Sequence, residues 1–221
     1  ASANTAVGNG ALGANTTGSS NVAVGSNCLL SNTTANNNTA VGHSALSANT
    51  TAVDNTAVGK DALLTTTTGH ENTAMGVSAL KLTTTGRSNV AMGRETMQNN
   101  TTGNYNTALG YEALKSNTTA SYNVAVGQAS LLSNITGTQN VAIGSYALDA
   151  ANTDNNTAIG YQAMTNATAS ECVAVGSRAL KAQTSAARCT AVGSEAATAV
   201  TTADDTTAIG RSALAACVTG A

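Results

Sequence analysis

The residues of this chain that could carry out chemistry are few, and their spacing does not gather them into a site. The histidines His43 and His70 belong to no HExxH, CxxC, GxSxG or phosphate-loop pattern. Carboxylates such as Asp61 and Glu95 are scattered along the chain and often follow a lysine or arginine. This pattern is typical of solubilising surface charges. We therefore expect no enzyme, no metal site and no cofactor.

Two of the four cysteines are placed to react with each other. Cys172 and Cys189 occupy equivalent places in two successive copies of a 17-residue motif. If the chain stacks these units at the ~4.8 Å spacing of β-strands, their Cα atoms fall within the range that a disulfide accepts. Side chains stacked in parallel would nevertheless present an unfavourable dihedral angle. Two interpretations stay open: a disulfide, or two small residues that fill a stack.

The spacing of these two cysteines is also the period of the whole chain. The motif N-[TV]-A-[VILM]-G or a close variant occurs 13 times, with ten 17-residue steps and two 16-residue steps. The full repeat reads N-[TV]-A-[VILM]-G-x-x-A-L-x-x-x-T-T-[GA]-x-x, and we number its places as repeat positions 1 to 17. Ala at position 3 and Gly at position 5 never vary. We expect residues 1–221 to form a single repeat array, with coils that start near Asn4, Asn21, Asn38, Asn55, Asn72, Asn89, Asn106, Asn123, Asn140, Asn156, Cys172, Cys189 and Thr206.

The composition fits a thin, layered interior. Phe, Trp and Pro are absent, charged residues make up 9% of the chain, and the formal net charge is −2. There is thus no basic surface for nucleic acid or for an anionic membrane, and no apolar run approaches the ~20 residues of a membrane-spanning helix. Disorder is an unsuitable interpretation, because a solvated linker has no reason to keep aliphatic residues at fixed positions.

A 17-residue period predicts one coil of an all-β fold, a parallel β-solenoid or β-roll of 13 coils. It is too short for helix-pair repeats. Two short strands, N-T-A-V and x-A-L, would be joined by two turns, with the glycine at a corner that needs positive φ. Alternation along the first strand places repeat positions 2 and 4 on one face and the invariant Ala on the other.

The asparagine at repeat position 1 has a structural explanation. Identical amides on successive coils can hydrogen-bond along the stack as a ladder. We favour this role over ligand binding for Asn4, Asn21, Asn38, Asn55, Asn72, Asn89, Asn106, Asn123, Asn140 and Asn156.

Apolar residues fall on both faces of the predicted first strand. In a sheet this pattern indicates burial on both sides, so one face needs a partner beyond the coil interior. We infer that several chains associate laterally. Neither end of the chain reads as a cap, so we also expect it to continue or to stack end to end into a filament.

The motif cores N-T-A-V-G (Asn4–Gly8) and N-V-A-I-G (Asn140–Gly144) resemble the repeats of the YadA-like head of trimeric autotransporter adhesins and similar bacterial and phage fibres. The resemblance covers all 13 repeats, although the period here is longer than in that family. It implies a left-handed parallel β-roll, a homotrimer and an extracellular place on a cell surface or virion fibre. The expected function is a rigid structural and adhesive segment that presents or spaces a receptor-binding region.

Surface recognition would fall in the variable positions. Tyr105 and Tyr122 share repeat position 17 and could stack on a glycan or a protein of a host surface; alternatively they cover the turn. An ice-binding β-solenoid with threonine ladders is the competing function. Against it, the two threonines of each T-T pair are neighbours in sequence, so an extended backbone would point them in opposite directions.

Overall fold

The computed structural model describes residues 1–150 and 152–216, and their regular secondary structure consists of 13 three-residue strands. The chain divides into two compact units, Ala1–Leu109 with Asn117–Thr119, and Gly110–Ser116 with Ala120–Ala221. The first unit holds β1 (Thr5–Val7), β2 (Val22–Val24), β3 (Thr39–Val41), β4 (Thr56–Val58), β5 (Thr73–Met75), β6 (Val90–Met92) and β7 (Thr107–Leu109). The second holds β8 (Val124–Val126), β9 (Val141–Ile143), β10 (Thr157–Ile159), β11 (Val173–Val175), β12 (Thr190–Val192) and β13 (Thr207–Ile209).

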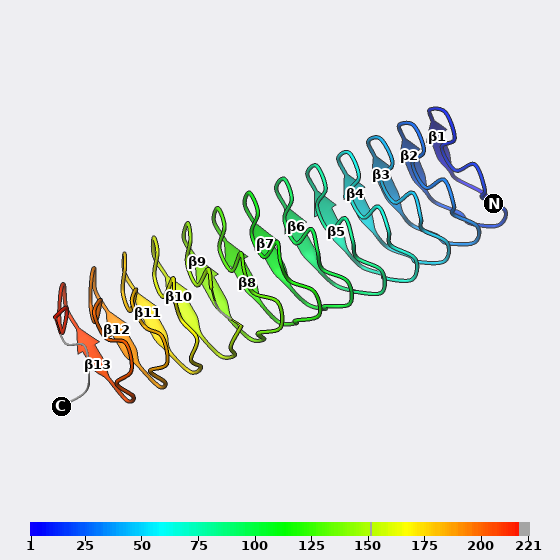
Figure 1. Ribbon diagram of the computed structural model, residues 1–221. Helices are drawn as coiled ribbons and strands as arrows, with labels where there is room; N and C mark the ends of the chain where they lie inside the picture. The colour runs from blue at the N-terminus through cyan, green and yellow to red at the C-terminus, as the bar shows by residue number, and fades with distance from the viewer. Residues whose placement is uncertain (151, 217–221) are drawn as a thin grey trace. The chain divides into compact units, whose positions relative to one another are not determined.

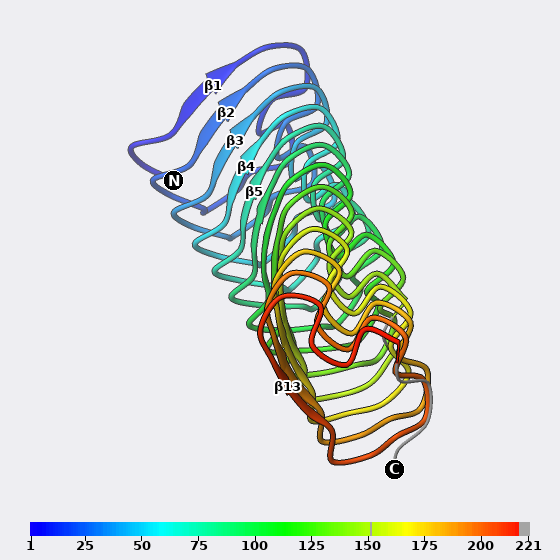
Figure 2. The same cartoon turned by 90° about the vertical axis from the view of Figure 1, so that its left-hand side faces the viewer.

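Within each unit the strands pair in parallel and in chain order, one strand per coil (Figure 1). The register joins equivalent repeat positions: Ala23 pairs with Ala40 in the first unit, and Ala125 pairs with Ala142 in the second. Seen along the stack, β1 to β5 lie on the same side of their coils (Figure 2). This confirms an all-β parallel β-solenoid in which each turn holds one copy of the repeat.

The second strand predicted over x-A-L is wrong for the described residues, which form turns there. Positions 7 and 9 both adopt left-handed backbone angles, for example φ 57° at Ser44 and 50° at Leu46. The coils still bond to each other, since the N–H of Leu46 donates to the carbonyl of Ala62 at 3.0 Å. A left-handed leucine costs roughly 1–2 kcal/mol, and its complete burial offsets that cost.

Two separate features of the backbone require the invariant glycine at position 5. At Gly42 the backbone has φ 129°, which side chains with a Cβ rarely adopt. A Cβ atom there would also lie 2.7 Å from the carbonyl oxygen of Gly59 in the next coil. The corner that the sequence predicted after the strand is thus confirmed, and the close stacking of successive coils adds a second reason.

The T-T-[GA] segment closes each coil around a carbonyl of the next one. The N–H groups of Thr16, Thr17 and Gly18 all point to the carbonyl oxygen of Thr33, at 2.9, 3.1 and 3.4 Å. The Thr16 hydroxyl donates to the same oxygen at 2.9 Å. In the 16-residue coil that starts at Asn140, Thr153 takes the place of the position 15 glycine. Its backbone carbonyl accepts a hydrogen bond from the Asn140 side-chain amide at 2.7 Å. The missing residue therefore falls in the return bend.

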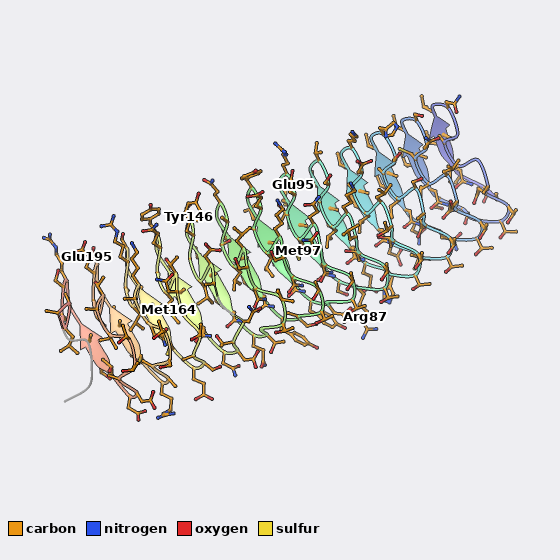
Figure 3. The ribbon with its side chains drawn as sticks, in the orientation of Figure 1. Arg87, Glu95, Met97, Tyr146, Met164 and Glu195 are labelled. Carbon is orange, nitrogen blue, oxygen red and sulfur yellow. The ribbon has the colours of Figure 1, made fainter. Side chains whose placement is uncertain are left out.

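Small and aliphatic side chains fill the interior of each coil. The alanines at positions 3 and 8 and the leucine at position 9 are fully buried in coils such as that of Ala40, Ala45 and Leu46. Met97 in the first unit and Met164 in the second replace that leucine inside their coils (Figure 3). Burial of the position 3 alanine, predicted from strand alternation, is confirmed.

Candidate functional site

The outer face of the strands carries two files of side chains that range from partly buried to exposed, which we call the outer-face files. They consist of repeat positions 2 and 4. Position 2 is Thr or Val in every coil and position 4 is Val, Ile, Leu or Met, so neither file contains a charge. In the first unit Met75, Met92 and Leu109 are 40%, 38% and 46% exposed. The repeat itself creates this surface, because positions 2 and 4 recur in each coil.

The position 1 asparagines lie inside the coils and link them. The Oδ1 atom of Asn38 accepts the backbone N–H of Asn55 at 3.0 Å. The Asn38 side-chain amide donates across its own coil to the carbonyl of Ala52 at 2.9 Å. Direct amide-to-amide bonds join some neighbours, as from Asn72 to Asn55 at 3.2 Å. These side chains hold the solenoid together and are inaccessible to a ligand, because from Asn21 onward they are fully buried.

A second file of asparagines, at repeat position 12, was missed from the sequence. Its amides bond directly from coil to coil, as from Asn32 to Asn15 at 3.0 Å. They also donate to the position 15 carbonyl that the first file uses. The N-T-T triplet that recurs in the return bend could have revealed this file, because its Asn faces the interior of the coil. The members of this file are Asn15, Asn32, Asn49, Asn100, Asn117 and Asn134.

The second file is interrupted where threonine replaces asparagine. Thr66 and Thr83 occupy position 12 in two successive coils and are fully buried. The Oδ1 atom of Asn49, the last member before the interruption, and the hydroxyl of Thr83 have no hydrogen-bond partner. A buried acceptor without a donor costs roughly 1–3 kcal/mol. The interruption is therefore a weak point of the interior.

Comparisons of this chain with family models, curated proteins and solved structures find no match.

Of the two interpretations left open for Cys172 and Cys189, the structure has the two small residues that fill a stack: both are free, buried thiols. Each sulfur takes over the donor role of the asparagine it replaces, and Cys189 Sγ donates to the carbonyl of Ala203 at 3.4 Å. Cys172 Sγ donates to the carbonyl of Ala186 at 3.3 Å and accepts the N–H of Cys189 at 3.3 Å. The thiols thus point in parallel to their own coils rather than to each other. Burial raises the pKa of the Cys172 thiol to about 11. Cys28 is also buried, as expected for an alanine position, whereas Cys217 lies outside the described residues.

Tyr105 and Tyr122 both lie at position 17 with left-handed backbone angles, φ 56° and 63°. Tyr105 belongs to the first unit and is 44% exposed, and the Arg87 guanidinium lies 5.7 Å from the centre of its ring. Tyr122 belongs to the second unit and is 59% exposed. In Figure 3, Arg87 and Glu95 lie at opposite edges of the stack of coils.

The remaining candidates for chemistry lie apart on the surface. His43 Nδ1 is 3.0 Å from the hydroxyl of Ser44, and His70 Nδ1 is 3.6 Å from a carboxylate oxygen of Glu71. Across residues 1–150 and 152–216 no three His, Cys, Asp or Glu side chains gather as metal ligands. The same residues form no pocket, and none of their segments is a helix suited to cross a bilayer. The surfaces of the coils are the features from which a function can be proposed.

Proposed function

We propose that this chain is a structural and adhesive segment of an extracellular fibre, in which three copies associate along their outer-face files into a rigid rod. The observation that carries the proposal is that both files are uncharged in every coil and that none of their side chains is fully buried. Exposed side chains of this kind, repeated without interruption, are typical of a surface that is covered in the assembled protein.

The size of the surface fits such an association. The seven strands of the first unit present two outer-face side chains each. A stable interface buries roughly 800 Å² per partner, which a continuous file of partly exposed side chains along seven strands can approach. A second copy of the chain repeats at the same ~4.8 Å coil spacing, so it can match the files coil by coil.

Three chains, a left-handed coil and a place on a cell surface or virion fibre come from the resemblance of the N-T-A-V-G motif to YadA-like head repeats. In this arrangement one face of the sheet packs inside the coil and the other packs against partner chains. This accounts for the apolar residues on both sides of β2 (Val22–Val24). The fibre would present or space a receptor-binding region on a host surface.

The solution mass of the folded chain, measured by light scattering, tests the proposal. We expect a trimer. Val41→Lys with Val58→Lys places charges in the outer-face file and should yield folded monomers. Thr51→Lys with Thr68→Lys puts the same charges on exposed threonines of the return bend and should leave the mass unchanged. A wild-type chain that is a stable, folded monomer would remove the basis for the fibre.

Ice binding is the second candidate, because one threonine file is regular and exposed. In the T-T pairs the first hydroxyl bonds to a carbonyl, as from Thr50 to Thr67 at 3.3 Å, whereas the second threonine faces solvent. The exposed file in the first unit is Thr17, Thr34, Thr51, Thr68, Thr85, Thr102 and Thr119. A single file is a narrow surface, so we rank this function second. Clear thermal hysteresis, lost in Thr51→Lys with Thr68→Lys, would reverse the ranking.

A further inference from the structure

One corner of the second unit differs in chemistry from the rest of the surface. The corner follows the invariant glycine, at repeat positions 6 and 7. Backbone bonds set its register: Ala129 N–H to the Tyr111 carbonyl at 2.9 Å, Tyr146 N–H to Gln128 at 2.9 Å, and Gln162 N–H to Ser145 at 3.0 Å. We call this surface the aromatic corner; it consists of Tyr111, Gln128, Ser145, Tyr146, Tyr161 and Gln162.

The aromatic corner concentrates the aromatic residues of a chain that has few. The chain has five tyrosines and no Phe or Trp, and three of the five lie here within four successive coils. Tyr111 and Tyr161 are 41% and 47% exposed. Tyr146 lies at the outer end of its coil in Figure 3, and its hydroxyl accepts a hydrogen bond from Gln128 Nε2 at 3.3 Å.

Positions 6 and 7 of the four coils carry a single charged side chain, the carboxylate of Glu112, and that carboxylate is paired. Glu112 directly follows Tyr111 in the first of these coils and bonds to Lys115 at 2.6 Å. Arg178 on the following side pairs with Glu195 at 3.5 Å. From Gln128 to Gln162, positions 6 and 7 hold only Gln, Ala, Ser and Tyr. In the first unit the same positions have no tyrosine and include charges such as that of Lys60. The combination of tyrosines and amides with no unpaired charge is therefore specific to this stretch.

We infer that the aromatic corner binds an extended, neutral glycan that runs along the stack. A pyranose ring has an apolar C–H face that suits a tyrosine ring, and hydroxyls around its rim that suit amides and hydroxyls. Gln128, Ser145 and Gln162 supply these polar groups beside the rings. The four coils span roughly 14 Å at ~4.8 Å per coil, and a sugar unit is about as long as one coil spacing. The corner thus offers contacts to consecutive sugar units of a linear chain.

This inference rests on the adhesive part of the proposed function and does not depend on the number of chains in the fibre. It is tested by isothermal titration of the full chain with linear hexamers of β-1,4-linked glucose and of β-1,4-linked N-acetylglucosamine. A hexamer of galacturonic acid serves as the acidic probe. We expect saturable binding of a neutral hexamer with a Kd between roughly 1 mM and 10 µM, and weaker binding of the acidic one.

The decisive variant is Tyr111→Ala with Tyr146→Ala and Tyr161→Ala, which should weaken neutral-hexamer binding at least tenfold. The matched control, Tyr105→Ala with Tyr122→Ala, removes exposed tyrosines from the position 17 corner and should bind like wild type. No binding of either neutral hexamer, or equal loss in the control, would overturn the inference. Circular dichroism and light scattering of the same samples separate the two proposals: a monomer that binds glycan contradicts the fibre alone, and a trimer that binds none contradicts the glycan site alone.

Discussion

The side-chain amide of Asn49 donates to Oδ1 of Asn32, one coil earlier, at 2.9 Å. Its own Oδ1 receives no donor, because Thr66 occupies the next place in the file. Thr66→Asn with Thr83→Asn should therefore join the file from Asn49 to Asn100 and satisfy each amide in turn. We expect a gain of about 1–3 kcal/mol in the free energy of unfolding, measured by urea denaturation.

The control for that pair is Thr68→Asn with Thr85→Asn. These threonines are exposed in the same coils, so the change should be within about 0.5 kcal/mol of zero. If the buried pair gains no more than the exposed pair, the partnerless oxygen is not the cause of any weakness at this place.

A larger side chain at the invariant alanine should be damaging. Ala125 is fully buried and pairs in register with Ala142. Ala125→Leu should overpack the coil and cost roughly 1–3 kcal/mol or more in thermal or urea unfolding. Val126→Leu adds bulk on the outer side of the same strand and should cost much less. Equal melting of Ala125→Leu and wild type would mean that the alanine file is not the packed one.

Left-handed positions occupied by residues other than glycine should be sites of stabilisation. Ser44 has φ 57°. Ser44→Gly should relieve the backbone strain and raise the free energy of unfolding by about 0.5–1 kcal/mol. Ser47→Gly, in the same coil but without a left-handed angle, should instead lower it through the larger entropy of the unfolded chain. A loss of stability at both sites would contradict this assignment of strain.

The buried cysteine should make stability depend on alkaline pH. Burial raises the pKa of Cys172 from 9.0 to about 11, because the thiolate is disfavoured inside the coil. The unfolded chain therefore loses its thiol proton first as the pH rises. The stabilisation is complete below pH 9 and is lost progressively between about pH 9 and pH 11. Urea unfolding at several pH values should show this loss in wild type, and Cys172→Ser should reduce it.

The sequence predicted the coil, the strand and its facing, because position 3 never varies and strand alternation is a strong constraint. It did not predict the second half of the coil. The composition of the x-A-L segment is typical of a strand. The residue types of Ser44 and Leu46 do not predict the left-handed backbone angles that both adopt. The position 12 file was also missed, because Thr66, Thr83 and Gln183 break its pattern. Cys172 and Cys189 were correctly placed in one stack, but spacing alone does not reveal where a sulfur points.

The shared position 15 carbonyls have a calorimetric consequence. In each of several coils, two inward amides converge on one oxygen, as those of Asn21 and Asn32 do on Ala35 at 2.8 and 3.2 Å. Unfolding such a coil hydrates amides and alanine methyls together with one leucine, and no aromatic side chain. Polar exposure lowers the heat capacity change of unfolding and apolar exposure raises it. The heat capacity change of unfolding per residue should thus fall below the usual ~12–15 cal/mol/K. The fold should therefore lose less stability on cooling than a globular domain with an aromatic core.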